Sequence, residues 1–162
     1  IEDSPGNFEH FEFLDTSGKP PMLDFVEKLV AAIDNDGPVL VYSSYEERIL
    51  REACIRYPHL EEKIKGIQAR LFDLLPLTKK YYCHPEMRGS WSIKSVLPTF
   101  APELDYGDLE VQGGQAAQQK FLEIIKPGIS ENELEKGRTS LLEYCKRDTL
   151  AMVKLAQFLA NT

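Results

Sequence analysis

The chain has 162 residues, of which 43% are hydrophobic, and a formal net charge of −7 at pH 7. This length is enough to bury one sizeable core and is short for two ordinary domains, so we expect a single domain over residues 1–162. No apolar run reaches membrane-spanning length and the N-terminal stretch lacks a signal-peptide pattern, which predicts a cytoplasmic protein without a membrane partner. The three cysteines contain no C-x-x-C pair, so neither a disulfide framework nor a zinc or iron–sulfur cage is indicated.

In chain order, strand patterns alternate with helix patterns. Strands are predicted in "NFEHFEFLD" near the start, in the continuous apolar run "VLVY", and in "RLFD", where Asp73 is placed to cap a following helix. Helices are predicted in "PMLDFVEKLVAAID", "YEERILREACIRY", the stretch from His59 to Lys65, "LLPLTKKYY", "SIKSVL" and "QAAQQKFLEII", and from the S-x-x-E box at Ser130 onward. The predicted fold class is α/β, with a mixed sheet flanked by helices.

An aspartate interrupts the apolar face of the last predicted helix, "LLEYCKRDTLAMVKLAQFLA". Steps of three and four predict a buried stripe made of Leu141, Cys145, Met152, Leu155 and Leu159. Asp148 completes that stripe, although an ionised carboxylate is costly to desolvate unless a cation or several donors meet it. Tyr144 lies one turn earlier on the same face, so a carboxylate and a phenol stand together where they can hold a divalent ion and orient a bound water.

Plainer interpretations of these two residues remain open. Asp148 could cap a helix that restarts at "RDTLAM", or it could be a buried acid paired with Arg147 or Arg138. Tyr144 taken alone is more often a core aromatic residue with its hydroxyl at the surface.

The Y-x-x-x-D spacing of Tyr144 and Asp148 resembles the third motif of the DEDD exonucleases of the ribonuclease H-like superfamily, in the tyrosine-bearing subclass. The stretch "VLVYSSYEERIL" resembles the second motif, a strand and polar turn followed by an aromatic residue, Tyr45, and an acid, Glu46. Family members usually have asparagine in this turn and aspartate as the acid. The segments "ARLFDLL" and "GSWSIKSVL" resemble a further conserved stretch of such nucleases. More closely still, "YYCHPEMRGSWSIKSVLP" together with "LLEYCKRDTLAMVKL" resembles the bacterial family called domain of unknown function 2779, from about Asp24 onward.

This resemblance implies a ribonuclease H-like fold and a metal-dependent 3′ to 5′ exonuclease activity on single-stranded DNA or RNA ends. Asp148 and Glu46 would be ligands of Mg²⁺ or Mn²⁺, and Tyr144 would orient the attacking water. Two such ions about 4 Å apart clamp the water and the leaving oxygen, and hard cations prefer oxygen ligands. Glu46 taken alone is an ordinary acid in the first turn of a helix.

The first motif of the superfamily, an Asp-x-Glu on the opening strand, is missing before Glu46. Asp108-Leu109-Glu110 has that spelling but follows the second motif in a predicted loop, so we interpret it as coincidence. The chain begins at Ile1 and not at methionine. We therefore expect a fragment truncated at the N-terminal strand, inactive alone, whose first-motif acids belong to an upstream domain of the same protein.

Positive charge gathers in "KKYYCHPEMRGSWSIK", within an otherwise acidic chain. The residues predicted to contact nucleic acid are Lys79, Lys80, Arg88, Trp91 and Lys94. Aromatic and basic residues together make a platform on which single-stranded bases stack while phosphates are held. The alternative is a solvated loop whose aromatic residues pack on the core. His84 has no second histidine at ligand spacing, so a metal role is not expected.

The sequence therefore leaves two alternative functions, which belong to different classes. The first is the exonuclease-like domain, and the second is a non-catalytic interaction module that keeps the fold and has lost the site. An Asp-x-Glu strand upstream in the parent protein would favour the first, and its absence the second.

Overall fold

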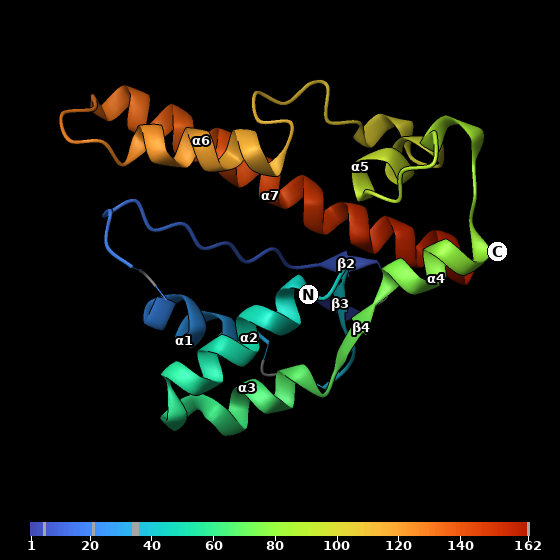
Figure 1. Ribbon diagram of the computed structural model, residues 1–162, viewed down its shortest axis with the longest axis horizontal. Helices are drawn as coiled ribbons and strands as arrows, with labels where there is room; N and C mark the ends of the chain where they lie inside the picture. The colour runs from blue at the N-terminus through green and yellow to red at the C-terminus, as the bar shows by residue number, and fades with distance from the viewer. Residues whose placement is uncertain (5, 21, 34–35, 162) are drawn as a thin grey trace. The chain divides into compact units, whose positions relative to one another are not determined.

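The computed structural model describes residues 1–4, 6–20, 22–33 and 36–161, and Figure 1 traces its elements. The chain divides into two compact units, each with its own core. The sheet unit consists of Ile1–Phe13 and Pro21–Tyr82, and the helical unit consists of Leu14–Pro20 and Cys83–Thr162. The single domain expected from the chain length stays a prediction.

A parallel pair of strands organises the sheet unit. Strand β3 (Val39–Val41) pairs with β4 (Leu71–Asp73), and Val41 lies opposite Asp73. The connection between them contains α2 (Tyr45–Arg56), the short 3₁₀ turn η1 (Pro58–Leu60) and α3 (Glu61–Gln68), as expected for parallel neighbours. Helix α4 (Leu74–Tyr81) follows β4 directly, and Asp73 caps it by accepting a hydrogen bond from the backbone N–H of Leu75 at 2.9 Å. The predicted cap is confirmed.

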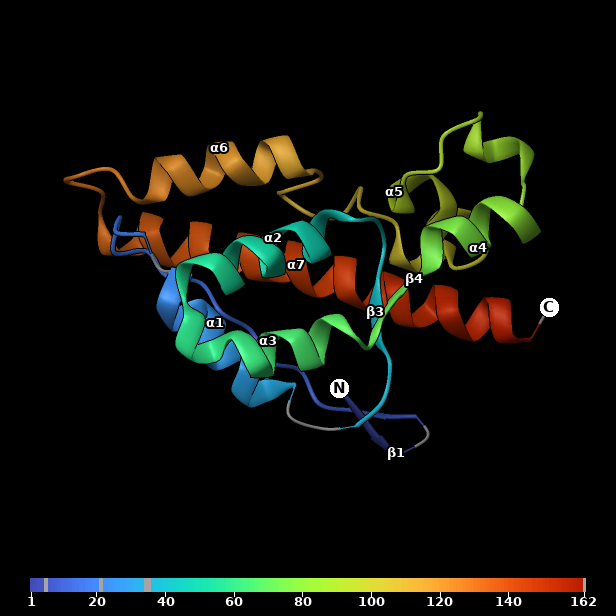
Figure 2. The ribbon, with the colours of Figure 1, turned by 60° about the horizontal axis from the view of Figure 1, so that its bottom comes forward.

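Three helices close the core of this unit beside the strands (Figure 2). Helix α1 (Met22–Ala32) buries Val26 and Val30, which pack with the buried residues of α2 and α3. The buried partners are Leu50 and Ala53 on α2, and Ile64 and Ile67 on α3.

The strand predicted for "NFEHFEFLD" forms only at its beginning. Strand β1 (Glu2–Ser4) pairs antiparallel with β2 (Asn7–Phe8), and residues 9–16 form no regular element. Phe8 and Phe11 are both exposed, so the imperfect alternation of phenylalanines gives no buried face that would fix a longer strand. Phe13 instead packs on Phe25 of α1, with ring centroids 5.8 Å apart.

The helical unit is built on one long helix, α7 (Glu131–Ala160), with α6 (Gly114–Ile124) lying along it (Figure 1). Short elements precede this pair: η2 (Pro85–Met87), α5 (Ile93–Val96), η3 (Leu97–Thr99) and η4 (Pro102–Leu104). The two helices approach closely at Gly137, where an added Cβ would lie 2.3 Å from Cγ2 of Ile124.

Helix α7 starts with the predicted capping box, in which Ser130 Oγ accepts from the Glu133 N–H and Glu133 Oε2 accepts from the Ser130 N–H. The helix then continues without a break, so the suggestion that Asp148 caps a restarted helix is wrong. The predicted stripe is also wrong in part, because Cys145 is exposed. The residues that α7 buries are Gly137, Ser140, Leu141, Tyr144, Ala151 and Leu155.

The observed class is mixed α/β, mostly helical with a small parallel sheet. The ribonuclease H-like topology stays a prediction. Across the described ranges, the helices lack the combination of length and apolar character needed to cross a membrane.

Candidate functional site around Asp148

Asp148 faces a tyrosine. Its Oδ1 accepts a hydrogen bond of 2.6 Å from the hydroxyl of Tyr106, which comes from the loop between η4 and α6. Tyr106 is buried, with 5% of its surface exposed, and Asp148 is half-buried. A hydrogen bond from a hydroxyl to an ionised carboxylate is among the strong ones. The partner of Asp148 on the apolar face of the helix is therefore the hydroxyl of Tyr106.

The two arginines considered as partners of Asp148 bind elsewhere. Arg147 holds Asp108 with two hydrogen bonds, Nη1 to Oδ1 at 3.1 Å and Nη2 to Oδ2 at 3.0 Å. Arg138 donates to the backbone carbonyl of Leu14 at 2.8 Å. The interpretation of Asp148 as an arginine-paired acid is wrong, and Asp108 has a structural partner of its own.

Tyr144 lies beside the same carboxylate and is contacted by the ammonium of Lys94. The rings of Tyr106 and Tyr144 have centroids 6.2 Å apart. The ammonium of Lys94 donates to the Tyr144 hydroxyl at 3.0 Å and stands 4.6 Å from the Tyr144 ring centroid and 5.3 Å from that of Tyr106. Cation–π attraction of this kind strengthens where water is excluded. We call Lys94, Tyr106, Tyr144 and Asp148 the tyrosine cluster.

Burial raises the pKa of both tyrosines above the ordinary value, and the hydrogen bond to Asp148 and its negative charge raise it further. An anionic phenolate next to an anionic carboxylate is unfavourable in a place that is poor in water. Tyr106 and Tyr144 therefore stay protonated at neutral pH, and Tyr106 acts as the donor to Asp148.

Glu46 belongs to the sheet unit and begins α2 directly after β3. The turn before it contains Ser43, whose φ of 146° is unusual for a residue with a side chain and whose Oγ accepts from the Tyr45 N–H at 3.2 Å. Glu46 Oε2 is buried and has no hydrogen-bond partner within the described part of the chain. A buried carboxylate oxygen without a partner is expensive, and an ion is one of the standard explanations.

Glu46 and Asp148 thus lie in different units, and their expected role as ligands of the same pair of ions stays a prediction. Both offer carboxylate oxygen, which fits the preference of Mg²⁺ and Mn²⁺. Their number does not complete a site, because the described residues contain no group of three or more histidines, cysteines and acids that could hold a metal.

The residues predicted to bind nucleic acid are not placed together by the structure. Lys79 and Lys80 are exposed in the last turn of α4, in the sheet unit, and Lys80 lies over the Tyr81 ring at 4.8 Å. Arg88 is exposed and Trp91 is half-buried, both in the helical unit. Lys94 alone of these five residues belongs to the tyrosine cluster, through its contacts with Tyr144 and Tyr106. The nucleic-acid platform stays a prediction.

Sequence reasoning missed Tyr106. It lies in a short loop of acids and glycine that has no periodic pattern, and its partner is 42 residues away along the chain. Lys94 was expected to contact phosphate but not to touch Tyr144.

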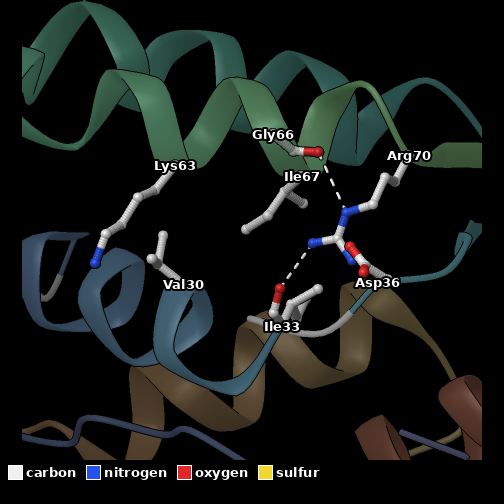
Figure 3. A pocket seen from close by; sticks show the side chains of 7 residues that line it. All are labelled: Val30, Ile33, Asp36, Lys63, Gly66, Ile67 and Arg70. Carbon is white, nitrogen blue, oxygen red and sulfur yellow. Dashed lines mark hydrogen bonds between the residues drawn. The ribbon is translucent and has the colours of Figure 1, made fainter.

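Among the described residues, at least two cavities lie in the sheet unit. The first, of about 250 Å³, opens at the carboxyl ends of β3 and β4, and its lining consists of Val41, Ser43, Ser44, Glu47, Gln68, Leu71 and Asp73. Ligands of open α/β sheets usually bind at this end of the strands. The second, of about 310 Å³, lies at the other end of β4, and Figure 3 shows its seven lining residues. There Arg70 donates to the carbonyls of Ile33 at 2.7 Å and Gly66 at 3.3 Å, so its guanidinium joins the residue that follows α1 to α3 and has a structural role.

Residues 1–92 match the family described as "Domain of unknown function (DUF2779)". The chain belongs to this family. The matched region contains Glu46 and ends before the tyrosine cluster. The family resemblance is confirmed over residues 1–92, a region that begins before Asp24 and ends before the segment "LLEYCKRDTLAMVKL". The resemblance of that later segment to the family, and the resemblance to DEDD exonucleases, stay predictions.

Curated relatives of this DUF2779 chain come from mycoplasmas. It is 29% identical over 135 residues to the uncharacterized protein MG366 of Mycoplasma genitalium, a match that covers 76% of this chain and 20% of the relative. It is 28% identical over 138 residues to the uncharacterized protein UU173 of Ureaplasma parvum, covering 74% of this chain and 20% of the relative. The chain therefore spans about a fifth of the length of the curated relatives it matches. No solved structure matches it significantly.

Proposed function

We propose that this chain carries part of a metal-dependent exonuclease-like site of the ribonuclease H-like type, which acts on single-stranded DNA or RNA ends in a longer parent protein. Asp148 and Glu46 are the proposed ligands of Mg²⁺ or Mn²⁺, and Tyr144 is the proposed water-positioning residue. The observation that carries the proposal is Asp148 on the inner stripe of α7, one turn after Tyr144 and oriented by Tyr106 without an arginine partner. The buried and unpartnered Oε2 of Glu46 supports it independently.

Each residue of the tyrosine cluster has a defined task in this proposal. Bound divalent ions supply Lewis-acid activation of water and stabilise the leaving oxygen. Tyr106 donates to Oδ1 of Asp148, and since a carboxylate offers about four lone-pair sites, the group can still bind a further partner. The Tyr144 hydroxyl, kept protonated by its environment, orients a water by hydrogen bonding.

The site is incomplete in this chain. Two carboxylates are fewer than a two-metal clamp requires, and the described residues hold no further acids grouped for the purpose. The proposal places the remaining ligands elsewhere in a longer protein, in keeping with relatives about five times the length of the match.

The test compares the purified 162-residue chain with a full-length family member, each incubated with end-labelled single strands in Mg²⁺ or Mn²⁺. We expect degradation by the full-length protein, loss of that activity on the substitution equivalent to Asp148→Asn, and almost no activity of the short chain. Glu143→Gln, an exposed acid on the same helix, is the matched control and should leave activity unchanged. Robust degradation by the short chain that Asp148→Asn abolishes would contradict the incomplete site.

A non-catalytic interaction module is the second candidate. The observation that favours it is the Lys94 ammonium beside Tyr144, which puts a protein cation in the neighbourhood where metal ions would bind. A full-length protein that binds oligonucleotides or protein partners without degrading any strand, in either metal, would favour this module.

A further inference from the structure

The cavity at the carboxyl ends of β3 and β4 is a site that the proposed metal chemistry does not use. Its volume is about 250 Å³, and all its lining residues belong to the sheet unit. Two neighbouring parallel strands end here, where ligands of open α/β sheets usually bind. Pockets for drug-sized ligands measure about 300–1,000 Å³, so this cavity fits a smaller group, such as a single sugar ring.

Two carboxylates make the lining rich in hydrogen-bond acceptors. Asp73 accepts one hydrogen bond, from the backbone N–H of Leu75 at 2.9 Å, and Glu47 accepts one, from Nη2 of Arg51 at 2.6 Å. A carboxylate has about four lone-pair sites, so both acids can accept further hydrogen bonds. Hydrogen bonds from hydroxyls to carboxylates are among the strong ones. The same two negative charges disfavour a phosphate group inside the cavity.

The lining also contains donors. Gln68 Oε1 accepts from the Cys54 thiol at 3.7 Å, and the described residues offer no acceptor to the amide N–H groups of Gln68. Ser44 is the N-cap residue of α2, and its hydroxyl makes no capping hydrogen bond there. A ligand that satisfies this lining must therefore accept as well as donate. A hydroxyl does both, whereas an ammonium has donors only.

Aliphatic side chains complete the lining. Val41 of β3 is 5% exposed, and Leu71 of β4 is half-buried. Small-molecule sites typically combine such apolar surface with a few polar groups that fix the orientation of the ligand. The carbon face of a sugar ring can pack on the aliphatic side chains while its hydroxyls reach the acids and the amide.

We propose that this cavity binds the cis-2′,3′-diol of a ribose ring, with Asp73 and Glu47 accepting from the hydroxyls and Gln68 donating to one of them. This inference goes beyond the proposed function, since it needs neither Asp148 nor a metal ion. A free nucleoside carries this diol, and so does the 3′-terminal nucleotide of an RNA strand. DNA lacks the 2′-hydroxyl, the group by which a protein distinguishes RNA from DNA.

The experiment titrates the 162-residue chain with nucleosides and follows the methyl resonances of Val41 and Leu71 by NMR. We expect uridine to shift both, and 2′,3′-dideoxyuridine to bind at least about tenfold more weakly, because the hydrogen bonds to the carboxylates are lost. The affinity of 2′-deoxyuridine should lie between them. Propylammonium tests the cationic alternative and should bind more weakly than uridine. Equal binding of uridine and dideoxyuridine, stronger binding of propylammonium, or no shift up to the solubility limit of uridine would each overturn the inference.

Variants of the two acids test the lining directly. Asp73→Asn removes the charge and keeps a good helix cap, and it should weaken uridine binding about tenfold. Glu52→Gln is the matched control for Glu47→Gln, because Glu52 also pairs with an arginine of α2, Arg48 at 3.0 Å, and does not line the cavity. Glu47→Gln should weaken uridine binding severalfold, and Glu52→Gln should not change it. If Asp73→Asn does not fold, Glu47→Gln decides the question. Unchanged uridine affinity in the folded acid variants would overturn the inference.

Two strands separate the two sources of the diol. One is a short oligouridylate with a free 3′-terminal ribose, and the other has the same sequence with a 2′,3′-dideoxy end. Tighter binding of the first strand than of uridine would identify RNA ends as the ligand, and tighter binding of uridine would identify a free nucleoside. Every titration is made without divalent metal, so failure of this inference is distinct from failure of the proposed function. Equal shifts of the Val41 and Leu71 methyl groups by the two strands would overturn the role of the diol.

Discussion

The Tyr106 hydroxyl and the Asp148 carboxylate are joined by a hydrogen bond of 2.6 Å across 42 residues of sequence. This contact fixes the rotamer of an acid on the inner face of α7 and ties the loop before α6 to that helix. It gives the helical unit a polar interaction beside a mainly apolar core, where a lost partner is costly.

Tyr106→Phe should therefore destabilise the fold. The substitution keeps the ring and removes the donor, which leaves Asp148 half-buried without its closest partner and should lower the free energy of unfolding by about 1–3 kcal/mol. Urea unfolding followed by circular dichroism measures the change. Tyr81→Phe, at a tyrosine that is 62% exposed, is the control and should change stability by less than about 0.5 kcal/mol. Equal effects of the two substitutions would show that the hydrogen bond contributes nothing.

Three of the seven tyrosines, Tyr42, Tyr106 and Tyr144, should titrate abnormally. The pKa values of Tyr106 and Tyr144 are raised above the ordinary 10.0, so the folded state prefers their protonated forms. The stability that this preference contributes is complete below pH 10 and is lost as the pH rises through the raised pKa values. Absorbance of tyrosinate, recorded during a pH titration of the folded chain, should show three residues that ionise late or only on alkaline unfolding. Normal titration of all seven would contradict the buried cluster.

Gly137→Ala should destabilise the contact between α6 and α7. The new methyl group would meet Ile124 Cγ2 at 2.3 Å, so the helices must separate or the isoleucine must change rotamer, at a cost of about 1–3 kcal/mol. Gly66→Ala is a matched control, because Gly66 lies inside α3 with nothing within 4 Å of an added Cβ. That change should raise stability by up to about 1 kcal/mol through helix propensity. A neutral or stabilising Gly137→Ala would mean that the close packing at this position is wrong.

Glu46 and Asp148 should behave as partners in metal binding if they lie within about 8 Å, the span expected for ligands of two ions about 4 Å apart. Glu46→Gln and Asp148→Asn should each weaken Mn²⁺ binding, and the double variant should be no weaker than the worse single variant. Isothermal titration of a double-mutant cycle measures this coupling. Strictly additive effects would place the two acids in separate sites.

The basic segment makes a prediction that depends on salt. Each phosphate contact with a single strand lowers the logarithm of the binding constant by about 0.7 per decade of salt. Neutralising Lys79, Lys80 and Arg88 together should flatten the salt dependence of oligonucleotide binding, measured by fluorescence anisotropy. Neutralising Lys63, Lys146 and Lys154, three lysines outside the segment, should leave the slope nearly unchanged. A slope that is identical in both variants would exclude the segment as a nucleic-acid track.

The parts of this fold that depend on neighbouring residues were predictable from sequence. The Asp73 cap, the apolar β3 and the capping box at Ser130 are local signals, and the structure confirms each. The predicted buried face of α7 included Cys145, which is exposed. It also missed a buried glycine and a buried serine, because hydrophobicity alone does not identify such positions. Gly137 and Ser140 are buried since α6 packs closely there, and that is a property of the helix pair.

The candidate site was predictable only in its helical half. Tyr144 and Asp148 share a face because α-helical geometry fixes residues four apart, whereas Tyr106 and Lys94 reach them through loop conformations that carry no period. Long-range contacts of this kind are decided by tertiary packing.

The unbroken course of α7 sets which parts of the tyrosine cluster can move. Thirty helical residues form a rod of about 45 Å, and a hydrogen-bonded backbone carries Tyr144 and Asp148 as one rigid body. Lys94 stands on a four-residue helix and Tyr106 on a loop, so small shifts of these two can occur while α7 stays in place. When a ligand binds, we therefore expect Lys94 and Tyr106 to shift. Tyr144 and Asp148 keep their positions relative to each other, because both belong to the same rigid helix.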